Sequence, residues 1–473
     1  MEIEIQSTEV KKEPVNNTIM INNYFKDTFL KNLKLNIIII IISVALFIIE
    51  FFYRSPLFNY SLDFEKNWQE KASKATITTF KIFTKIGGEY LMAVPVIIVL
   101  WFFTLIKSFV YLMGFIFCLQ FHSMMKIWYG NKRPFWHIES LYKGICDGGF
   151  GNPSGHSIST TFLYLSLFIY YKQTKFLKDK LIVVIIILVF CLFWTVMILL
   201  SRLILGMHSV NQVIYGTSLG LIFCVLIFIV FKIHQIPVAN YKRFFMVKKY
   251  IYIILAIFCF FIILTFLNIP IFNRSFDKDK YDGLLDRVCE KKVAKYRRFN
   301  LDGLFGSITV LAMLGMYLGQ IVFWYLIENK YKYNVMNSIN NIKPIQDMNI
   351  NEIKFSNDNK NNMNDINSNK NEILNDDSID DLINHWNKNR IYICANFKNV
   401  FKVILTIIIC AIPGILFVAI PSDSNVVVIF IFKIGIPMFT VPFLLYSFGF
   451  YYIIKVSCGS KELLIKRLEE NKI

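Results

Sequence analysis

Long apolar runs limit this chain to few folds. Apolar stretches of roughly 17–25 residues recur along its 473 residues, and a stretch of this length can cross a bilayer whose hydrocarbon core is about 30 Å thick. Hydrophobic residues make up 55% of the sequence and 46 residues are Phe, a composition that is rare in soluble globular proteins. We therefore expect an all-α, polytopic membrane protein. The expected spans cover residues 36–53, 88–106, 109–127, 157–171, 181–200, 209–231, 250–268, 303–327, 401–420 and 426–454.

The chain divides into five regions. Residues 1–35 are polar, and we expect them to form an N-terminal segment on the cytoplasmic side. Residues 36–232 form a six-span core, and residues 250–327 add two spans. Residues 329–385 are rich in Asn, Asp and Lys and predict a disordered cytoplasmic linker, because they are too polar to bury a core. Residues 401–473 hold the last spans and a tail, so about four helices follow the core.

Positive charge sets the expected orientation. The formal net charge is +18, and Lys and Arg concentrate in the loops between spans four and five, between spans six and seven, and after the last span. A cytoplasmic N-terminus places all three on the cytoplasmic side, as the positive-inside rule requires. Two other basic loops, 54–87 and 269–302, fall outside in this topology. Within the first, the stretch Trp68–Ile86 fits an interfacial amphipathic helix or a plain loop equally well.

Charge and cysteine patterns exclude some partners. No basic, aromatic-interleaved domain exists outside the spans, so we expect no nucleic-acid partner. The nine cysteines show no metal-ligand spacing, so we expect no metal site. Cys146 and Cys289 both fall in expected non-cytoplasmic loops, where a disulfide is an open alternative. The sequence fits the endoplasmic reticulum, another endomembrane or the plasma membrane, and it leaves the oligomeric state open.

Three short charged blocks interrupt the apolar core. They are Lys126–Pro134 (KIWYGNKRP), Pro153–His156 (PSGH) and Ser201–His208 (SRLILGMH). All fall in loops three–four and five–six of the core, on the expected non-cytoplasmic side. Ionisable residues within membrane segments are energetically costly and usually functional. The blocks combine Lys, Arg and His, which together can bind a phosphate group and react with it.

Basic residues of the first and third blocks are candidate phosphate ligands. Lys126 ends the third span, and Arg133 precedes Pro134, which stops a helix. Lysine offers a point charge and arginine a bidentate fork, and both suit phosphate. We expect both side chains to face one aqueous cleft, with Arg202 at the end of the fifth span as a third ligand. Taken alone, such residues are better explained by snorkelling at helix ends.

Two histidines lie at expected helix starts. Ser154 can cap the fourth span and Gly155 lets the backbone approach a ligand, so the N–H groups of that turn form an anion site. His156 lies on the same turn. His208 opens the sixth span, placed for in-line attack on phosphorus, and Gln212 follows on the same helix face, where it can hold the other ring nitrogen. A single histidine at a helix start is more often structural, but three blocks together on one side favour function.

These blocks resemble those of a known family. The pattern K-x6-RP, PSGH, SR-x5-H is similar to the signature of the type-2 phosphatidic acid phosphatase superfamily, which includes lipid phosphate phosphatases, glucose-6-phosphatases and vanadium haloperoxidases. The resemblance covers roughly residues 36–232 and implies a six-helix core. It implies that His208 is a nucleophile forming a phosphohistidine and that His156 protonates the leaving alkoxide. It also implies a metal-free and cofactor-free phosphate site made of Lys126, Arg133, Ser154, Gly155 and Arg202.

One position departs from the common pattern of that superfamily. The family has Asp four residues after the nucleophile, and this chain has Gln212. An amide oxygen still accepts the imidazole N–H, but it does not offset imidazolium charge as a carboxylate does. This chain is similar to glucose-6-phosphatases here, because they also have Gln at this position. The run from Cys146 to His156 resembles theirs as well. The GMHS around His208 is closer to sphingoid-base phosphate phosphatases.

The sequence therefore predicts an integral-membrane, metal-independent phosphatase that hydrolyses phosphomonoesters on the luminal or extracellular side. A lipid phosphate, such as phosphatidate or a sphingoid-base phosphate, is the favoured substrate, and a sugar phosphate is the alternative. Its expected partners are this substrate and the membrane lipids. Two other classes stay open. A catalytically inactive binding protein has support from Gln212, and the spans beyond residue 250 allow a transporter.

Overall fold

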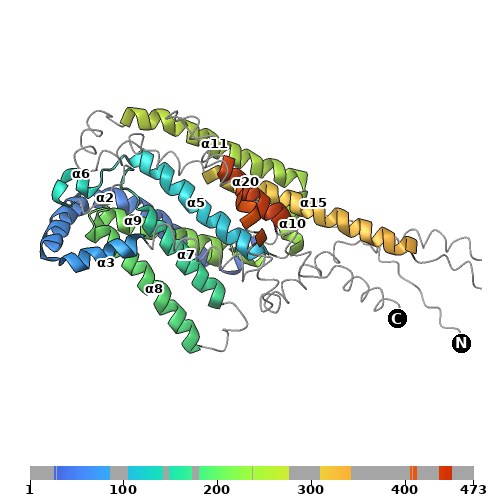
Figure 1. The fold of residues 1–473 in the computed structure, drawn as a ribbon, viewed down its shortest axis with the longest axis horizontal. Helices are drawn as coiled ribbons and strands as arrows, with labels where there is room; N and C mark the ends of the chain where they lie inside the picture. The colour runs from blue at the N-terminus through green and yellow to red at the C-terminus, as the bar shows by residue number, and fades with distance from the viewer. Residues whose placement is uncertain are drawn as a thin grey trace, which may run out of the picture.

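The chain folds as a bundle of helices in this computed structural model (Figure 1). The structure describes residues 26–85 except 28, 105–141, 149–172, 181–275 except 237, 309–341, 405–412 except 407, and 436–449. Every element assigned in these ranges is a helix, which confirms the all-α prediction. The main helices are α2 (Leu33–Lys71), α3 (Lys74–Lys85), α5 (Leu105–Tyr129), α6 (Pro134–His137), α7 (Gly155–Lys172), α8 (Leu181–Ile204), α9 (Val210–Val225), α10 (Val238–Met246), α11 (Lys248–Ser275), α15 (Thr309–Asn341) and α20 (Ile436–Leu444).

Length and apolar character mark this chain as a multi-pass membrane protein. The outer helices α2, α8 and α11 leave most of their apolar side chains exposed, since only 11% of each apolar window is buried. Inner helices α5 and α15 are 61% buried over the corresponding windows. An apolar surface of this extent is suited to lipid contact. Within the described residues, six segments are long and apolar enough to cross a membrane: Leu33–Lys71, Ile106–His137, Leu181–Ile204, Val210–Val230, Lys248–Leu267 and Thr309–Asn329.

Helix α7 lies inside the bundle, where α5, α8 and α9 pack against it. It matches the expected span 157–171, although its polar residues keep it out of the six strongly apolar segments. Gly216 and Gly220 of α9 face it, and a Cβ at either position would lie 2.6 Å from a backbone carbonyl oxygen of the facing segment. Small residues at this spacing let two membrane helices approach closely. The contact brings the PSGH block against the start of α9.

Residues 54–85 do not form the long loop that the sequence predicted for residues 54–87. Helix α2 continues from the first span to Lys71, and its 39 residues reach about 58 Å at 1.5 Å per residue, far beyond the hydrocarbon core. Polar residues on the second half of α2 are buried against the motif loops, which keeps this segment helical. Helix α3 follows and packs on α8, so this stretch is helical, and its interfacial position stays a prediction.

The expected linker also begins later than predicted. Helix α15 runs to Asn341, past the predicted boundary at residue 329. Each further residue of an existing helix adds a backbone hydrogen bond without a new nucleation cost, so a helix can extend into a polar sequence. The correction shortens the linker at its N-terminal end.

The helices after the core pack directly on it. One continuous hydrophobic cluster extends from α5 and α7 through α10 and α11 to α15. Gln120 of α5 reinforces this contact. Its Oε1 accepts the Val310 N–H at 2.8 Å and the Thr309 hydroxyl at 2.9 Å, and its Nε2 donates to Thr265 Oγ1 at 3.3 Å. Helix α20 lies along α15 (Figure 1).

Some expectations fall outside the described residues. These are nearly all of the span at 88–106, both Cys146 and Cys289, the linker beyond Asn341 and most of the two last spans.

Candidate active site

Arg133 joins the first and third charged blocks. It directly precedes α6, and its side chain is fully buried, so it does not face the open cleft that the sequence suggested. The guanidinium donates to the backbone carbonyls of Gly149, of Phe150 at 3.5 Å and of Met207 at 3.0 Å. These oxygens make burial of the cation tolerable. The Nη1 atom also lies 3.0 Å from Nε2 of His208.

The partners of His208 determine which ring nitrogen carries the proton. Arginine has only donors, so Nε2 of His208 is the acceptor in its contact with Arg133. Nδ1 lies 2.9 Å from the Gly151 carbonyl and 3.2 Å from Oε1 of Gln212, so Nδ1 is the donor. This tautomer keeps a lone pair on Nε2, as a nucleophilic imidazole requires. Arg133 and His208, which belong to separate blocks of the sequence, thus meet at one point.

A tight turn after α8 positions His208. The N–H groups of Met207 and His208 both donate to the carbonyl of Arg202, at 3.0 and 3.2 Å. Gly206 has a φ of +66°, and a Cβ there would lie 2.7 Å from the Leu141 carbonyl oxygen. Only glycine fits both conditions. The turn ends at Ser209, which caps α9.

Gln212 connects the third block to the other two. It is fully buried, and Oε1 accepts the Ser209 N–H at 3.3 Å in addition to the Nδ1–H of His208. Its Nε2 donates to the Lys132 carbonyl at 2.8 Å, and its backbone carbonyl accepts the Ser154 N–H at 3.0 Å. The expected contact with His208 is present. The Gly151 carbonyl is the closer partner, so Gln212 shares this task with the backbone.

The PSGH block forms the start of α7. Ser154 Oγ accepts the Ser157 N–H at 3.4 Å, which is the expected cap. His156 lies on the first turn and is partly exposed. Gly155 was the expected point of close approach by a ligand, and the structure places another side chain there. A Cβ at Gly155 would lie 2.8 Å from Nε2 of His122.

Lys126 and His122 lie one turn apart on α5. Residues four apart share a helix face, so Lys126 lies on the face that His122 turns toward the PSGH block. Lys126 is buried in the last turn of α5, again in contrast to the expected open cleft. His122 was not predicted from the sequence, although its four-residue spacing from Lys126 was a usable signal.

Arg202 lies at the buried end of α8. Its backbone carbonyl holds the turn that carries His208. Its Nη1 donates to Thr84 Oγ1 at 3.4 Å, and the Thr84 hydroxyl is also 2.7 Å from Ser201 Oγ. Helix α3, which supplies Thr84, therefore covers the SR block.

A polar stripe on α2 borders the site and was not recognised in the sequence. Ser61 Oγ accepts the Val210 N–H at 2.9 Å, and Gln69 Nε2 donates to the Ile204 carbonyl at 2.7 Å. The stripe thus supports both ends of the His208 turn. Polar residues at mostly four-residue spacing were the available signal. Its buried members are Glu50, Ser61, Glu65 and Gln69.

Comparison with known proteins identifies a family for part of the chain. A family model for the PAP2 superfamily matches residues 90–236, which include all three blocks. A solved structure, described as the first transmembrane PAP2-type phosphatidylglycerolphosphate phosphatase from Bacillus subtilis, is 18% identical, covering 39% of this chain and 92% of that chain with a TM-score of 0.34. No curated protein sequence matches the chain. Residues 90–236 belong to the PAP2 superfamily, and the chain is a multi-pass membrane protein.

Proposed function

We propose that the protein is an integral-membrane phosphatase that hydrolyses phosphomonoesters through a phosphohistidine at His208. The observation that carries this proposal is the arrangement of the His208 ring, with Nδ1 bonded to the Gly151 carbonyl and to Gln212, and Nε2 directed at Arg133. An imidazole held in this way can attack a phosphoryl group that the neighbouring guanidinium binds.

In the proposed reaction, the phosphate is bound by basic side chains and by the N–H groups at the start of α7. His208 Nε2 attacks phosphorus, and the bond between phosphorus and the leaving oxygen breaks as His156 donates a proton to that oxygen. Water then attacks the phosphohistidine while His156 takes up a proton, and inorganic phosphate leaves. The cations offset transition-state charge, so no step is assigned to a metal. These cations are Lys126, Arg133 and Arg202.

A lipid phosphate is the proposed substrate class. Helices α2 and α8 contribute to the site at one end and expose apolar side chains along the rest of their length. A lipid can therefore approach with its chains in the membrane. A sugar phosphate remains the second candidate, because Gln212 and the run from Cys146 to His156 resemble glucose-6-phosphatases.

Phosphate release by the purified, full-length protein tests the reaction and its substrate. The panel contains phosphatidate, lysophosphatidate, a sphingoid-base phosphate and glucose 6-phosphate, each with EDTA. We expect release from the lipids in EDTA and inhibition by vanadate, which adopts the geometry of the transferring phosphoryl group. Strict Mg²⁺ dependence would contradict the mechanism. Phosphate release from glucose 6-phosphate alone would favour the sugar phosphatase. Release from no member of the panel would favour the inactive binding protein.

We also propose that hydrolysis occurs on the non-cytoplasmic side. The support is the distribution of Lys and Arg in short loops. Protease treatment of sealed vesicles tests this orientation. The Asn-rich segment should be cut from the cytoplasmic face while the segment Lys126–His156 stays protected, and cleavage of both from one face would overturn the assignment.

A further inference from the structure

We propose that Glu50 of α2 is a positioning residue for His208, so that a helix outside the family segment 90–236 completes the active site. The inference rests on the proposed function, because it assigns a task within that reaction. Glu50 acts through Asn152 on the Gly151 carbonyl, and the Gly151 carbonyl is the closer acceptor of the His208 Nδ1–H.

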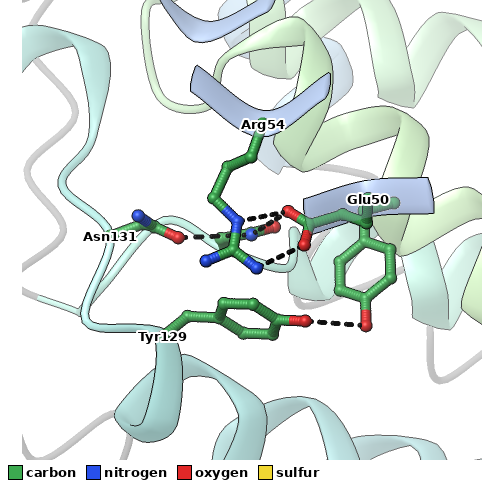
Figure 2. Close-up of polar contacts among 6 residues, drawn as sticks. Glu50, Arg54, Tyr129 and Asn131 are labelled. Carbon is green, nitrogen blue, oxygen red and sulfur yellow. Dashed lines mark hydrogen bonds and ion pairs between the residues drawn. The ribbon is translucent and has the colours of Figure 1, made fainter. Parts of the chain in front are cut away.

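Glu50 and Arg54 form an ion pair at the end of the expected first span, 36–53. Arg54 Nε donates to Glu50 Oε1 at 2.8 Å, and Arg54 Nη2 contacts Oε2. The Glu50 side chain is fully buried, whereas that of Arg54 is 20% exposed. Figure 2 shows the guanidinium between Glu50 and the Tyr129 ring, and its central carbon lies 3.9 Å from the ring centroid. Ionic groups in a membrane span are costly and usually functional.

The carboxylate of this pair reaches the motif loop. Asn152 Nδ2 donates to Glu50 Oε1 at 2.8 Å and to Asn131 Oδ1 at 3.3 Å. Asn152 is fully buried and directly precedes the PSGH block. Its side-chain amide is therefore held by the Glu50 carboxylate of α2 and by the Asn131 side-chain oxygen of the loop before α6 (Figure 2).

The link to His208 runs through one peptide unit. The Gly151 N–H donates to the Asn131 carbonyl at 2.7 Å, and the Gly151 carbonyl belongs to the same peptide unit as the Asn152 nitrogen. With the Asn152 side chain anchored to Glu50, this carbonyl is restrained on both sides. It then presents a defined oxygen to His208 Nδ1 at 2.9 Å. Groups that orient a metal-bound imidazole through its second nitrogen typically affect activity about 10–100-fold, and we expect an effect of similar size here.

The hydrogen bonds of Gln212 explain why this restraint on the Gly151 carbonyl matters. Oε1 of Gln212 accepts hydrogen bonds from both His208 Nδ1 and the Ser209 N–H. The ring therefore depends more on the Gly151 carbonyl than it would beside a dedicated carboxylate. Since Arg54 neutralises Glu50, the expected role of Glu50 is geometric: it should affect kcat through ring orientation and leave substrate binding nearly unchanged.

Steady-state kinetics of the full-length protein on a lipid phosphate test the inference. We expect Glu50→Ala to lower kcat about 10–100-fold with little change in KM. Glu50→Gln should retain most of kcat, because its amide oxygen still accepts the Asn152 N–H. Asn152→Ala should resemble Glu50→Ala. The double variant should be no slower than the slower single variant, because residues acting through one contact are not additive.

Gln120→Leu is the matched control, since it also removes a buried side chain with several polar partners, but from the helix interface outside the site. The inference is overturned if Glu50→Ala keeps wild-type kcat, if it changes only KM, if Gln120→Leu loses as much kcat, or if the Glu50 and Asn152 effects multiply. Where Glu50→Ala fails to fold, the comparison of Glu50→Gln with Asn152→Ala decides, and equal losses in kcat overturn the proposal. An inactive wild-type protein would instead refute the proposed function.

Discussion

Two buried polar clusters in this molecule follow different rules. The first surrounds Gln120 and joins three helices through neutral groups, with both amide atoms bonded between α5, α11 and α15. The second surrounds Arg133 and joins loops, with a guanidinium and an imidazole bonded largely to backbone carbonyls. Both are fully buried at their centres.

The difference separates a structural polar cluster from a chemical one. Around Gln120, donors and acceptors of different helices satisfy one another, which ties the additional helices to the core. Around Arg133, a full positive charge lies where charge is costly, and its partners are carbonyls on loops near helix ends. Phosphate oxygens can replace such neutral partners and add the opposite charge. We therefore expect substitutions in the second cluster to change turnover, and those in the first to change stability.

The largest effect is expected at the nucleophile. His208→Ala should lower kcat by about 10⁴-fold or more, because it removes the group that is proposed to accept the phosphoryl group. Phosphate release from the best lipid substrate measures this loss. Near-normal turnover of this variant would show that the two clusters do not differ in the proposed way.

A smaller but still large effect is expected from Arg133→Lys. An ammonium group keeps the charge, but it cannot bond to the three carbonyls and His208 in the planar arrangement of a guanidinium. We expect kcat/KM to fall about 10²–10³-fold, the range for removal of a donor to the reacting group. Wild-type kinetics would mean that charge alone, without geometry, defines this cluster.

Substitutions of Gln212 test whether this residue orients the His208 ring. Gln212→Leu should lower kcat about 10–100-fold, because it removes an acceptor of the His208 Nδ1–H. Gln212→Asp should preserve or raise kcat, because a carboxylate also accepts this hydrogen bond and offsets imidazolium charge. Unchanged turnover of the leucine variant would leave the Gly151 carbonyl as the sufficient orienting partner.

The smallest effect on activity is expected in the first cluster. Gln120→Leu leaves the Val310 N–H and the Thr309 hydroxyl without this acceptor, which should lower the free energy of unfolding by about 1–3 kcal/mol. Turnover should stay within about twofold of wild type, since substitutions away from a shared contact act independently. Thermal unfolding in detergent and phosphate release on the same preparation test both parts, and a large loss of kcat at unchanged stability would contradict the comparison.

Much of the candidate site could be predicted from the sequence because its signals are local. A charged block after an apolar run marks a helix end, and Ser154 before Gly155 predicts a cap that the structure contains. Gln212 lies four residues after His208, so their contact follows from helix geometry. The second half of α2 was missed because a polar stretch after a span was taken for a loop. The four-residue spacing of its polar residues indicates a buried helix face only when another part of the protein is known to cover that face.

The sequence by itself determined the all-α class, the membrane spans that the structure describes and the motif residues, since each depends on the length, order and spacing of neighbouring residues. Only the tertiary structure decided that Arg133 is buried, that it meets His208, that His122 borders Gly155 and that α2 reaches Asn152. Contacts between residues far apart in the chain depend on how helices pack. Close approaches such as that at Gly216 set this packing, and no local pattern specifies which side chains will face each other.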